Sequence, residues 1–407
     1  MDRRVVITGI GMVTPLGVGR EAFARALWSG QTGIGEVTAF PTDGLGSHLG
    51  AEVRDFQARD FISLKNLRKM DRLSAMTTAS VRMALDDAGL RIDPANRDRI
   101  GIVMGTAFGN TEHKVQSART LFTEGPAMVS PLHVPNTVMN APAGHASIEM
   151  GFRGVNTTVN HQAVSAETAI AYGAMEIRRG AADVILAGGG EILSPFFYEA
   201  LTRFKALSAA GGEAEGARPF DRTRNGPVLG EGCGIVCLEA EELARERGAA
   251  PYAELAGWGL GSSPAPATSW PADPRGYLLT LGRTLRMAGT TIGQIDLIGA
   301  AANGGRDLDA LEAGAYGKFF GERGVAPLIT SLKGATGEIF ASGGLRATAL
   351  ALSLREGIVP PVVGLAEPLC SLPFVIGEAR RAPVKTALLG GISYGGTYAC
   401  LVLKRGA

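Results

Sequence analysis

Short apolar runs alternate with longer amphipathic segments along most of the chain. Residues 5–7, 100–104 and 184–187 are typical of buried strands, and residues 21–29 have the spacing of a helix. Strand-like runs recur at 234–238, 295–298, 328–330 and 387–389. Repeated units of this kind predict an α/β protein with a mixed or mostly parallel sheet and helices on both of its faces.

The clearest helix is predicted over residues 165–180. Its apolar residues recur at helical spacing, Arg178 and Arg179 lie in the last turn, and Gly180 ends it. A nucleophile at the start of such a helix gains from the positive end of the backbone dipole, which stabilises a thiolate and an oxyanion alike. Gln162 and Ala163 stand at that place, and no thiol does.

The length of 407 residues predicts two domains or one large duplicated unit. Residues 261–266 read as a loop rich in glycine, serine and proline, and the sequence on either side has a similar texture. We therefore predict two related halves, 1–260 and 261–407. The 57 glycines indicate many tight turns and close backbone contacts.

Charge and composition exclude several classes of protein. With 40 Lys and Arg against 39 Asp and Glu, and without a basic block, the chain does not resemble a nucleic-acid binder. No segment approaches the roughly 18 uninterrupted apolar residues of a membrane span. The first residues resemble a signal peptide, but Pro15, Arg20 and Glu21 favour a buried strand and turn. The four cysteines show no zinc-type pairing, so we expect no metal, no cofactor and a cytoplasmic location.

Two glycine motifs have structural explanations. Gly9 and Gly11 follow a strand, but the third glycine of a dinucleotide-binding fingerprint is missing. Residues 391–395 read G-I-S-Y-G, the hydrolase pattern, but a strand-like segment over 397–403 follows where that pattern requires a helix. A second hydrolase arrangement would pair Ser165 with His161 and Glu338.

Several further motifs resemble those of one protein family. They are VVITGIG at 5–11 with TPLG at 14–17, MDR at 70–72, DDAGL at 86–90, ADV at 182–184 with AGG at 187–189, RPFD at 218–221 with GEG at 230–232, and YGGT at 394–397. Together they resemble the β-ketoacyl-acyl-carrier-protein synthases of the thiolase superfamily over nearly the whole chain. The resemblance implies a thiolase-type duplicated α/β fold with layered helices and mixed β-sheets.

That family condenses acyl chains with one cysteine and two histidines. Its cysteine follows a valine by four residues, which from Val159 leads to Ala163, and counting back from residues 182–184 gives Ala163 again. Gln162 takes this position only if a gap is introduced. The first histidine of the family corresponds to Ala301, and the second, five residues after the retained Lys333, corresponds to Glu338.

The resemblance therefore implies that all three catalytic positions have changed. Ala163 cannot form a thioester, and the loss of one oxyanion donor, as at Ala301, costs on the order of 10²–10³ in rate. An ionised Glu338 would repel a malonyl carboxylate. We expect no catalytic residue, and we expect Lys333 to support its loop.

These changes are similar to those in the chain-length factors, the noncatalytic ketosynthase-like subunits of type II polyketide and polyene systems. The run GGL at 343–345 matches them as well, and many of them carry glutamine at the cysteine position. The resemblance implies a heterodimer with a cysteine-bearing ketosynthase. It also implies that acyl carrier protein interacts with this chain through that complex. Phe108, in the segment 106–110 near the acyl pocket, is the expected tunnel gate, with an ordinary core residue as the alternative.

Two other functions stay open on the sequence. One is a divergent acyltransferase or hydrolase that uses Ser165, Ser393 or His161. The other is a homodimeric acyl-binding scaffold.

Overall fold

The computed structural model describes residues 3–209 and 214–406. Its centre is one mixed sheet of 12 strands in the order β11-β10-β14-β16-β9-β1-β8-β7-β5-β6, with β2 on β1 and β15 on β16. The strands of this sheet are β1 Val5–Thr14, β2 Gly17–Val18, β5 Ile100–Gly105, β6 Asn156–Val159, β7 Val184–Glu191, β8 Gly232–Ala240, β9 Ala253–Ser262, β10 Leu297–Gly299, β11 Leu328–Thr330, β14 Thr386–Leu389, β15 Ile392–Ser393 and β16 Thr397–Arg405. Two small ribbons pair β3 Ile34–Glu36 with β4 Leu49–Ala51 and β12 Ile358–Val359 with β13 Arg380–Arg381.

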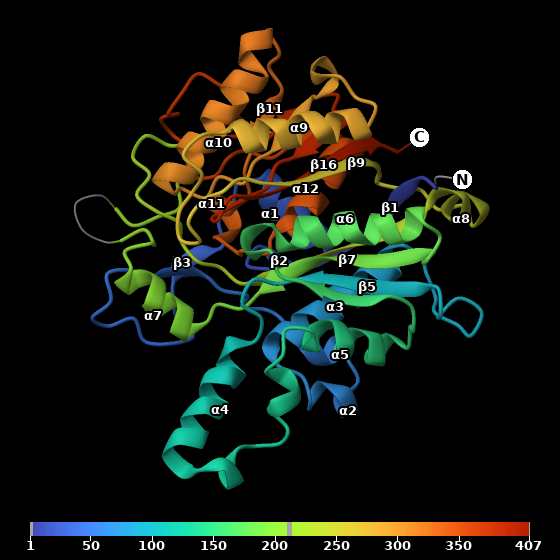
Figure 1. Cartoon of the computed structure of the whole chain (residues 1–407), viewed down its shortest axis with the longest axis vertical. Coiled ribbons are helices and arrows are strands. Elements are labelled where there is room, and N and C mark those ends of the chain that lie inside the picture. Colours follow the sequence, from blue (N-terminus) through green and yellow to red (C-terminus); the bar gives the residue numbers. More distant parts are fainter. Residues whose placement is uncertain (1–2, 210–213, 407) are drawn as a thin grey trace.

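Helices lie in layers around this sheet. They are α1 Arg20–Trp28, α2 Leu64–Leu67, α3 Arg72–Asp87, α4 Thr111–Glu124, α5 Ala141–Met150, α6 Ser165–Arg178, α7 Pro195–Arg203, α8 Glu241–Glu246, α9 Arg275–Met287, α10 Arg306–Phe319, α11 Lys333–Thr336 and α12 Gly343–Glu356. Helices α6 and α12 form the middle layer and contact strands from both ends of the sheet, while α3 with α5 and α9 with α10 form the outer layers (Figure 1). The predicted α/β fold with layered helices and a mixed sheet is confirmed.

The middle layer is tightly packed because small residues face the strands. A side chain added at Gly344 would place its Cβ 1.9 Å from the carbonyl oxygen of Gly234. The backbones of α12 and β8 therefore approach as closely as glycine permits. This contact accounts for the run GGL at the start of α12.

Two predicted elements are present in the structure, and one predicted loop begins later than expected. The predicted helix over 165–180 is confirmed as α6, and the predicted strand over 397–403 as β16. The predicted loop over 261–266 is wrong at its start, because Gly261 and Ser262 still pair with Tyr398 and Thr397. The proposed division after residue 260 thus falls near the end of β9, and the two halves stay a prediction.

In the described part of the chain, no helix combines the length and apolarity needed to cross a membrane.

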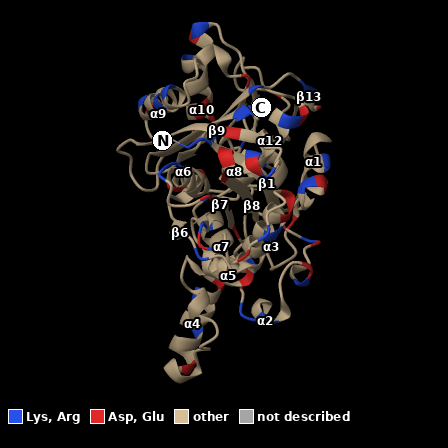
Figure 2. Ribbon diagram, turned by 90° about the vertical axis from the view of Figure 1, so that its right-hand side faces the viewer, with Lys and Arg blue, Asp and Glu red and all other residues tan. Residues whose placement is uncertain are grey.

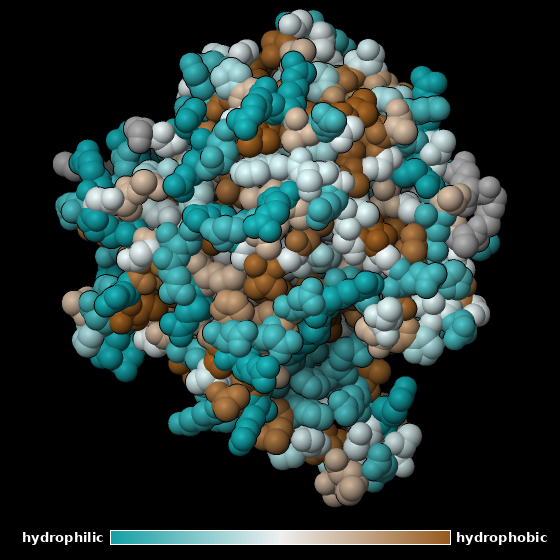
Figure 3. Space-filling model, turned by 180° about the vertical axis from the view of Figure 1, so that it is seen from behind, coloured by the Kyte–Doolittle hydropathy of each residue, from teal (hydrophilic) through white to brown (hydrophobic). Residues whose placement is uncertain are grey.

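One element projects from the body of the molecule. Helix α4 and the limb that returns from it, residues 125–140, form an arm that extends away from the layers (Figure 1). No Lys, Arg, Asp or Glu occurs between Glu124 and Glu149. The charge colours of the arm in Figure 2 accordingly lie on α4 and not on the returning limb, whereas the back of the body is mostly hydrophilic with scattered apolar residues (Figure 3).

Candidate functional site

The turn between β6 and α6 holds Gln162 in a strained conformation. Its φ of 50° is one of three positive values among the non-glycine residues described. Such conformations cost on the order of 1–3 kcal/mol and gather at functional sites, and a sharp turn from strand to helix is how hydrolases expose a nucleophile. The displayed side chain is therefore that of Gln162, a carboxamide without a thiol.

Ala163 follows immediately and points into the protein. It is 8% exposed, and its N–H faces the Oγ of Ser393 at 3.3 Å. The same hydroxyl lies 3.4 Å from the Oε1 of Gln162. Counting along the sequence selects Ala163 as the family cysteine position, whereas the strained conformation belongs to Gln162.

The cysteines of the chain lie elsewhere and are not activated. Cys233 and Cys237 in β8 and Cys400 in β16 are buried, and burial raises the pKa of each thiol to about 12. A thiol with such a pKa is protonated at neutral pH and is a poor nucleophile. Within residues 3–209 and 214–406, no group of three or more His, Cys, Asp or Glu is placed to hold a metal ion.

The loop that contains Ala301 is bound to two carboxylates of α10. The N–H groups of Ala301 and Ala302 donate to Glu312 at 2.8 Å each, and that of Asn303 donates to Asp309 at 3.0 Å. Burial raises the pKa of Asp309 to about 7, and burial also raises the pKa of Glu312 above its ordinary value. These N–H groups are engaged within the protein, and Ala301 has no side-chain donor, so the loop is poorly suited to stabilise an oxyanion.

Glu338 lies just after α11 and is part of a buried ion pair. Its Oε2 accepts from the Nζ of Lys333 at 2.8 Å and from the Nδ2 of Asn303 at 2.6 Å. The side chains of Lys333 and Glu338 are both 3% exposed. The retained lysine thus compensates the new carboxylate, and the position acts as an internal contact between two loops.

Aromatic rings fill the space beside these positions. Phe108 stacks on Phe197 with ring centroids 3.9 Å apart and meets the edge of Phe340 at 4.8 Å. Phe340 continues toward Tyr394 at 6.2 Å. Ala163 belongs to the same buried cluster. A cavity of only about 10 Å³ is left beside Phe108, Phe340 and Glu338, which is at the lower limit for one water molecule.

Sequence reasoning found some members of this site and missed others. Ala163, Phe108 and Glu338 meet around one cluster and its cavity, and Lys333 and the Ala301 loop join them through Glu338 and Asn303. It missed the aromatic partners Phe197 and Phe340, Asn303, and Glu191 at the end of β7. Glu191 had a signal, because it is an acid that directly ends a buried strand.

The serine hydrolase arrangement is not assembled. The Oγ of Ser165 is buried, donates to the carbonyl of Gln162 at 2.6 Å, and accepts from the backbone N–H of His161. The imidazole of His161 instead faces Thr168 at 3.4 Å, and Glu338 is paired with Lys333. A catalytic triad requires nucleophile, base and acid to contact one another in sequence, and these three groups do not.

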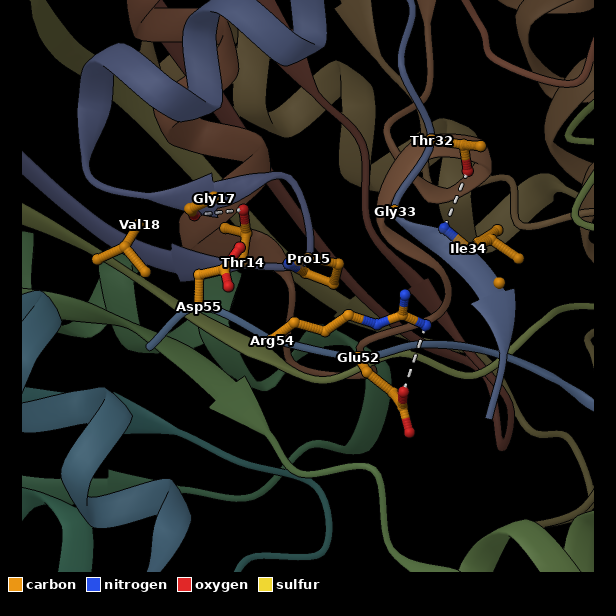
Figure 4. Close-up of a pocket in the computed structure, with 11 residues that line it drawn as sticks. Thr14, Pro15, Gly17, Val18, Thr32, Gly33, Ile34, Glu52, Arg54 and Asp55 are labelled. Carbon is orange, nitrogen blue, oxygen red and sulfur yellow. Dashed lines mark hydrogen bonds and ion pairs between the residues drawn. The ribbon is translucent and has the colours of Figure 1, made fainter. Parts of the chain in front are cut away.

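A separate cleft of about 240 Å³ lies beside the β1–β2 turn and β3 (Figure 4). Its polar groups are engaged locally: the Thr32 hydroxyl donates to the carbonyl of Gly334 at 3.1 Å, and Glu52 accepts from the hydroxyl of Thr38 at 2.7 Å. Arg54 extends across the cleft within 3.5 Å of Glu52. None of the altered positions lines this cleft, so it is not the site to which the altered motifs point.

Comparison with known proteins agrees with this geometry. The model for the N-terminal domain of beta-ketoacyl synthases matches residues 2–244, and that for the C-terminal domain matches residues 252–366. The 3-oxoacyl-[acyl-carrier-protein] synthase 2 of Vibrio cholerae is 35% identical over 410 residues, and that of Coxiella burnetii is 34% identical over 408 residues, with 99% of each chain covered in both cases.

Solved structures agree as well. The ishigamide ketosynthase/chain length factor superposes with a TM-score of 0.91 at 29% identity and full coverage of both chains. A beta-ketoacyl synthase from Burkholderia phymatum superposes with a TM-score of 0.92 at 27% identity, covering 99% of each chain. The fold and site therefore define a thiolase-type α/β protein built on a condensing-enzyme scaffold. The chain belongs to the beta-ketoacyl synthase family.

Proposed function

We propose that this chain is a noncatalytic member of its family, a chain-length factor that pairs with a cysteine-bearing ketosynthase. In the pair it shapes the acyl tunnel during polyketide or fatty-acid-type chain elongation. The observation that carries the proposal is the state of the three catalytic positions. The turn between β6 and α6, here called the elbow, has no thiol at Gln162 or Ala163, Ala301 offers no side-chain donor, and Glu338 is neutralised by Lys333.

The similar proteins fall into two groups, of which only the first includes a chain length factor. The ishigamide structure is a ketosynthase/chain length factor, and another neighbour, 27% identical with a TM-score of 0.90, is a type II acyl-carrier protein in complex with its ketosynthase bound to the hexaketide. The similar sequences are named as synthases. The loss of the catalytic groups, and not overall similarity, is therefore what favours the noncatalytic role.

The arm and the neighbouring edge strand are the surface that we assign to the partner ketosynthase. The arm exposes large apolar side chains, namely Leu121, Phe122, Met128, Leu132, Val134 and Val138. Strand β6 lies at one end of the sheet order, so its outer edge can pair with another strand. An arm with exposed apolar side chains and an uncharged returning limb, beside an open sheet edge, is suited to a second chain of related fold.

Phe108 connects this surface to the interior. It precedes α4 by only a few residues, so the arm begins where the aromatic cluster ends. In the proposed pair Phe108 limits the tunnel by filling volume, since protein interiors tolerate little overpacking. Phe108→Ala is expected to lengthen the products of the reconstituted pair, measured by mass spectrometry of the released chains.

The test of the proposed function uses the purified full chain. Incubated with acyl and malonyl carrier protein, it should acquire no acyl group by intact-protein mass spectrometry and form no condensation product. Co-expressed with the ketosynthase of its native host, it should copurify as a complex that does condense. Robust condensation by the chain alone would refute the proposal.

Two other results would select the alternatives. Labelling of Ser165 or Ser393 by a serine-reactive acyl probe would favour a divergent acyltransferase or hydrolase. A stable homodimer that ignores the ketosynthase in sizing experiments would favour an acyl-binding scaffold.

A further inference from the structure

The turn that carries Phe108 is held by one buried carboxylate. Glu191, the last residue of β7, is 3% exposed. Its Oε1 accepts from the hydroxyl of Thr106 at 2.8 Å and from the N–H of Ala107. Its Oε2 faces the N–H of Phe108 at 3.4 Å. Both carboxylate oxygens therefore point at donors of the turn.

The opposite side of the turn is bound through its carbonyl groups. The Nδ2 of Asn160 donates to the carbonyl of Ala107 at 2.8 Å, and the Nζ of Lys114 donates to that of Phe108 at 3.3 Å. With its carbonyls fixed on one side, the turn keeps its orientation only while the N–H side is held as well. Glu191 is the group that holds it.

We propose that Glu191 is a positioning residue for the gate: by accepting hydrogen bonds from the turn, its carboxylate keeps the ring of Phe108 between Phe197 and Phe340 and so sets the length of the tunnel. This inference rests on the proposed function, because a gate affects product length only in a pair that elongates chains. Glu191 does not touch the reacting atoms and acts through Phe108.

The protonation state of Glu191 decides how many hydrogen bonds its side chain can accept. An ionised carboxylate only accepts, whereas a protonated one turns one oxygen into a donor. Burial raises the pKa of Glu191 to about 7. The titratable groups that face it are Tyr394, the thiol of Cys233, and Glu338 with its partner Lys333. The carboxyl is about half protonated near pH 7, so the hold on the turn is stronger at pH 8 and weakens toward pH 6.

The contribution of Glu191 to the free energy of unfolding changes with pH in the opposite direction to its hold on the turn. This difference separates a positioning role from a merely structural one. The folded pKa of Glu191 lies above the ordinary value of 4.5, so the folded state binds the proton more tightly than the unfolded state. This group therefore adds stability as the pH falls from 7 toward 4.5. Local loosening of the turn without loss of global stability is the expected signature.

The first experiment measures amide hydrogen exchange in the isolated chain. In the wild type, the protection factors of the Ala107 and Phe108 amides should fall about tenfold from pH 8 to pH 6, as expected for one net hydrogen bond. In Glu191→Gln they should be low at both pH values. A matched control is Asp221→Asn, another buried carboxylate that binds a turn through Thr223. Unchanged protection in Glu191→Gln would overturn the proposal.

The second experiment measures product length in the reconstituted pair. Glu191→Gln should shift products toward longer chains, in the direction of Phe108→Ala but by less, and wild-type products should lengthen from pH 8 to pH 6. Phe108→Ala should show no such pH dependence. If Phe108→Ala lengthens products and Glu191→Gln does not, Glu191 is not a determinant. If Phe108→Ala has no effect, the proposed gate fails, while hydrogen exchange still decides whether Glu191 holds the turn.

Discussion

The altered site and the projecting arm differ in whether their side chains have partners within the protein. Inside, Lys333 and Glu338 pair at 2.8 Å, although the Oε1 of Glu338 has no hydrogen-bond partner among the described residues, and the cavity beside them is only about 10 Å³. On the arm, apolar side chains such as Phe122 and Leu132 are 86% and 67% exposed. The altered positions are held by partners inside the protein, while the arm exposes apolar surface that another chain can cover.

This difference bears on the proposed noncatalytic role. A catalytic site keeps polar groups unpaired or strained so that they can act on a substrate. Here the positions of the family's second histidine and lysine form an ion pair, and the loop of the first histidine is fixed by Glu312. Under the proposed noncatalytic role, the chain would act through the surface of the arm and through the turn that joins the two regions.

The largest effect is expected from breaking the interior pair. Lys333→Met would leave Glu338 buried with Asn303 as its remaining partner. Removing one member of a buried ion pair costs on the order of 3–5 kcal/mol, and urea denaturation should show a loss of about that size in the free energy of unfolding. The double variant Lys333→Met/Glu338→Leu should recover most of it, because an apolar replacement of a whole pair is often neutral. A single variant as stable as the wild type would contradict the described pairing.

The sequence predicted the fold class, which is confirmed, and it assigned the family's catalytic positions to Ala163, Ala301 and Glu338, because both steps depend on motifs of short range. Strand and helix periods are local, and Glu338 lies five residues after Lys333, so its position follows by counting. The ion pair between these two residues was accessible to the same counting and was not foreseen.

Other features depend on contacts that counting does not reach. Phe108, Phe197 and Phe340 come from three distant segments, and their stacking follows only from the packed sheet. The positive φ of Gln162 is a backbone property that no residue type announces, since glutamine rarely adopts it. An ungapped count therefore led to Ala163, one residue past the strained position.

A smaller effect, on binding and not on folding, is expected from the arm. Phe122→Asp should weaken the complex with the ketosynthase by about 30- to 1,000-fold, corresponding to about 2–4 kcal/mol for a hot-spot aromatic. Stability of the isolated chain should change by no more than about 0.5 kcal/mol, as for most surface substitutions. Calorimetric titration and urea denaturation measure the two quantities.

A matched control for Phe122 lies off the arm. Phe204, just after α7, is 80% exposed, so Phe204→Asp makes the same change at a similar exposure. It should leave the binding constant unchanged. Equal loss in both variants would show that the arm is not the specific contact, and no loss in either would assign the partner to another face.

The smallest effect, about tenfold in rate, is expected from returning a thiol to the elbow. Gln162 is half-buried, in a strained turn at the start of the helical segment, where the backbone dipole lowers a thiol pKa. Ala163 is 8% exposed and clusters with Phe340 and Leu193. Gln162→Cys should therefore react with iodoacetamide about ten times faster than Ala163→Cys, since a difference near 1.4 kcal/mol corresponds to that factor.

The rates are read by mass spectrometry of the modified peptides, with the partly exposed Cys370 as an internal reference in both variants. Faster labelling of Ala163→Cys would instead support the position found by counting and would show that strain at Gln162 does not mark the displayed residue. Neither variant should condense acyl chains, because the thiol returns without the two histidines. Ala301 still has no side-chain donor, and Glu338 is still held by Lys333. After acylation of the elbow, no group at these two positions would therefore stabilise the oxyanion that develops in the condensation step.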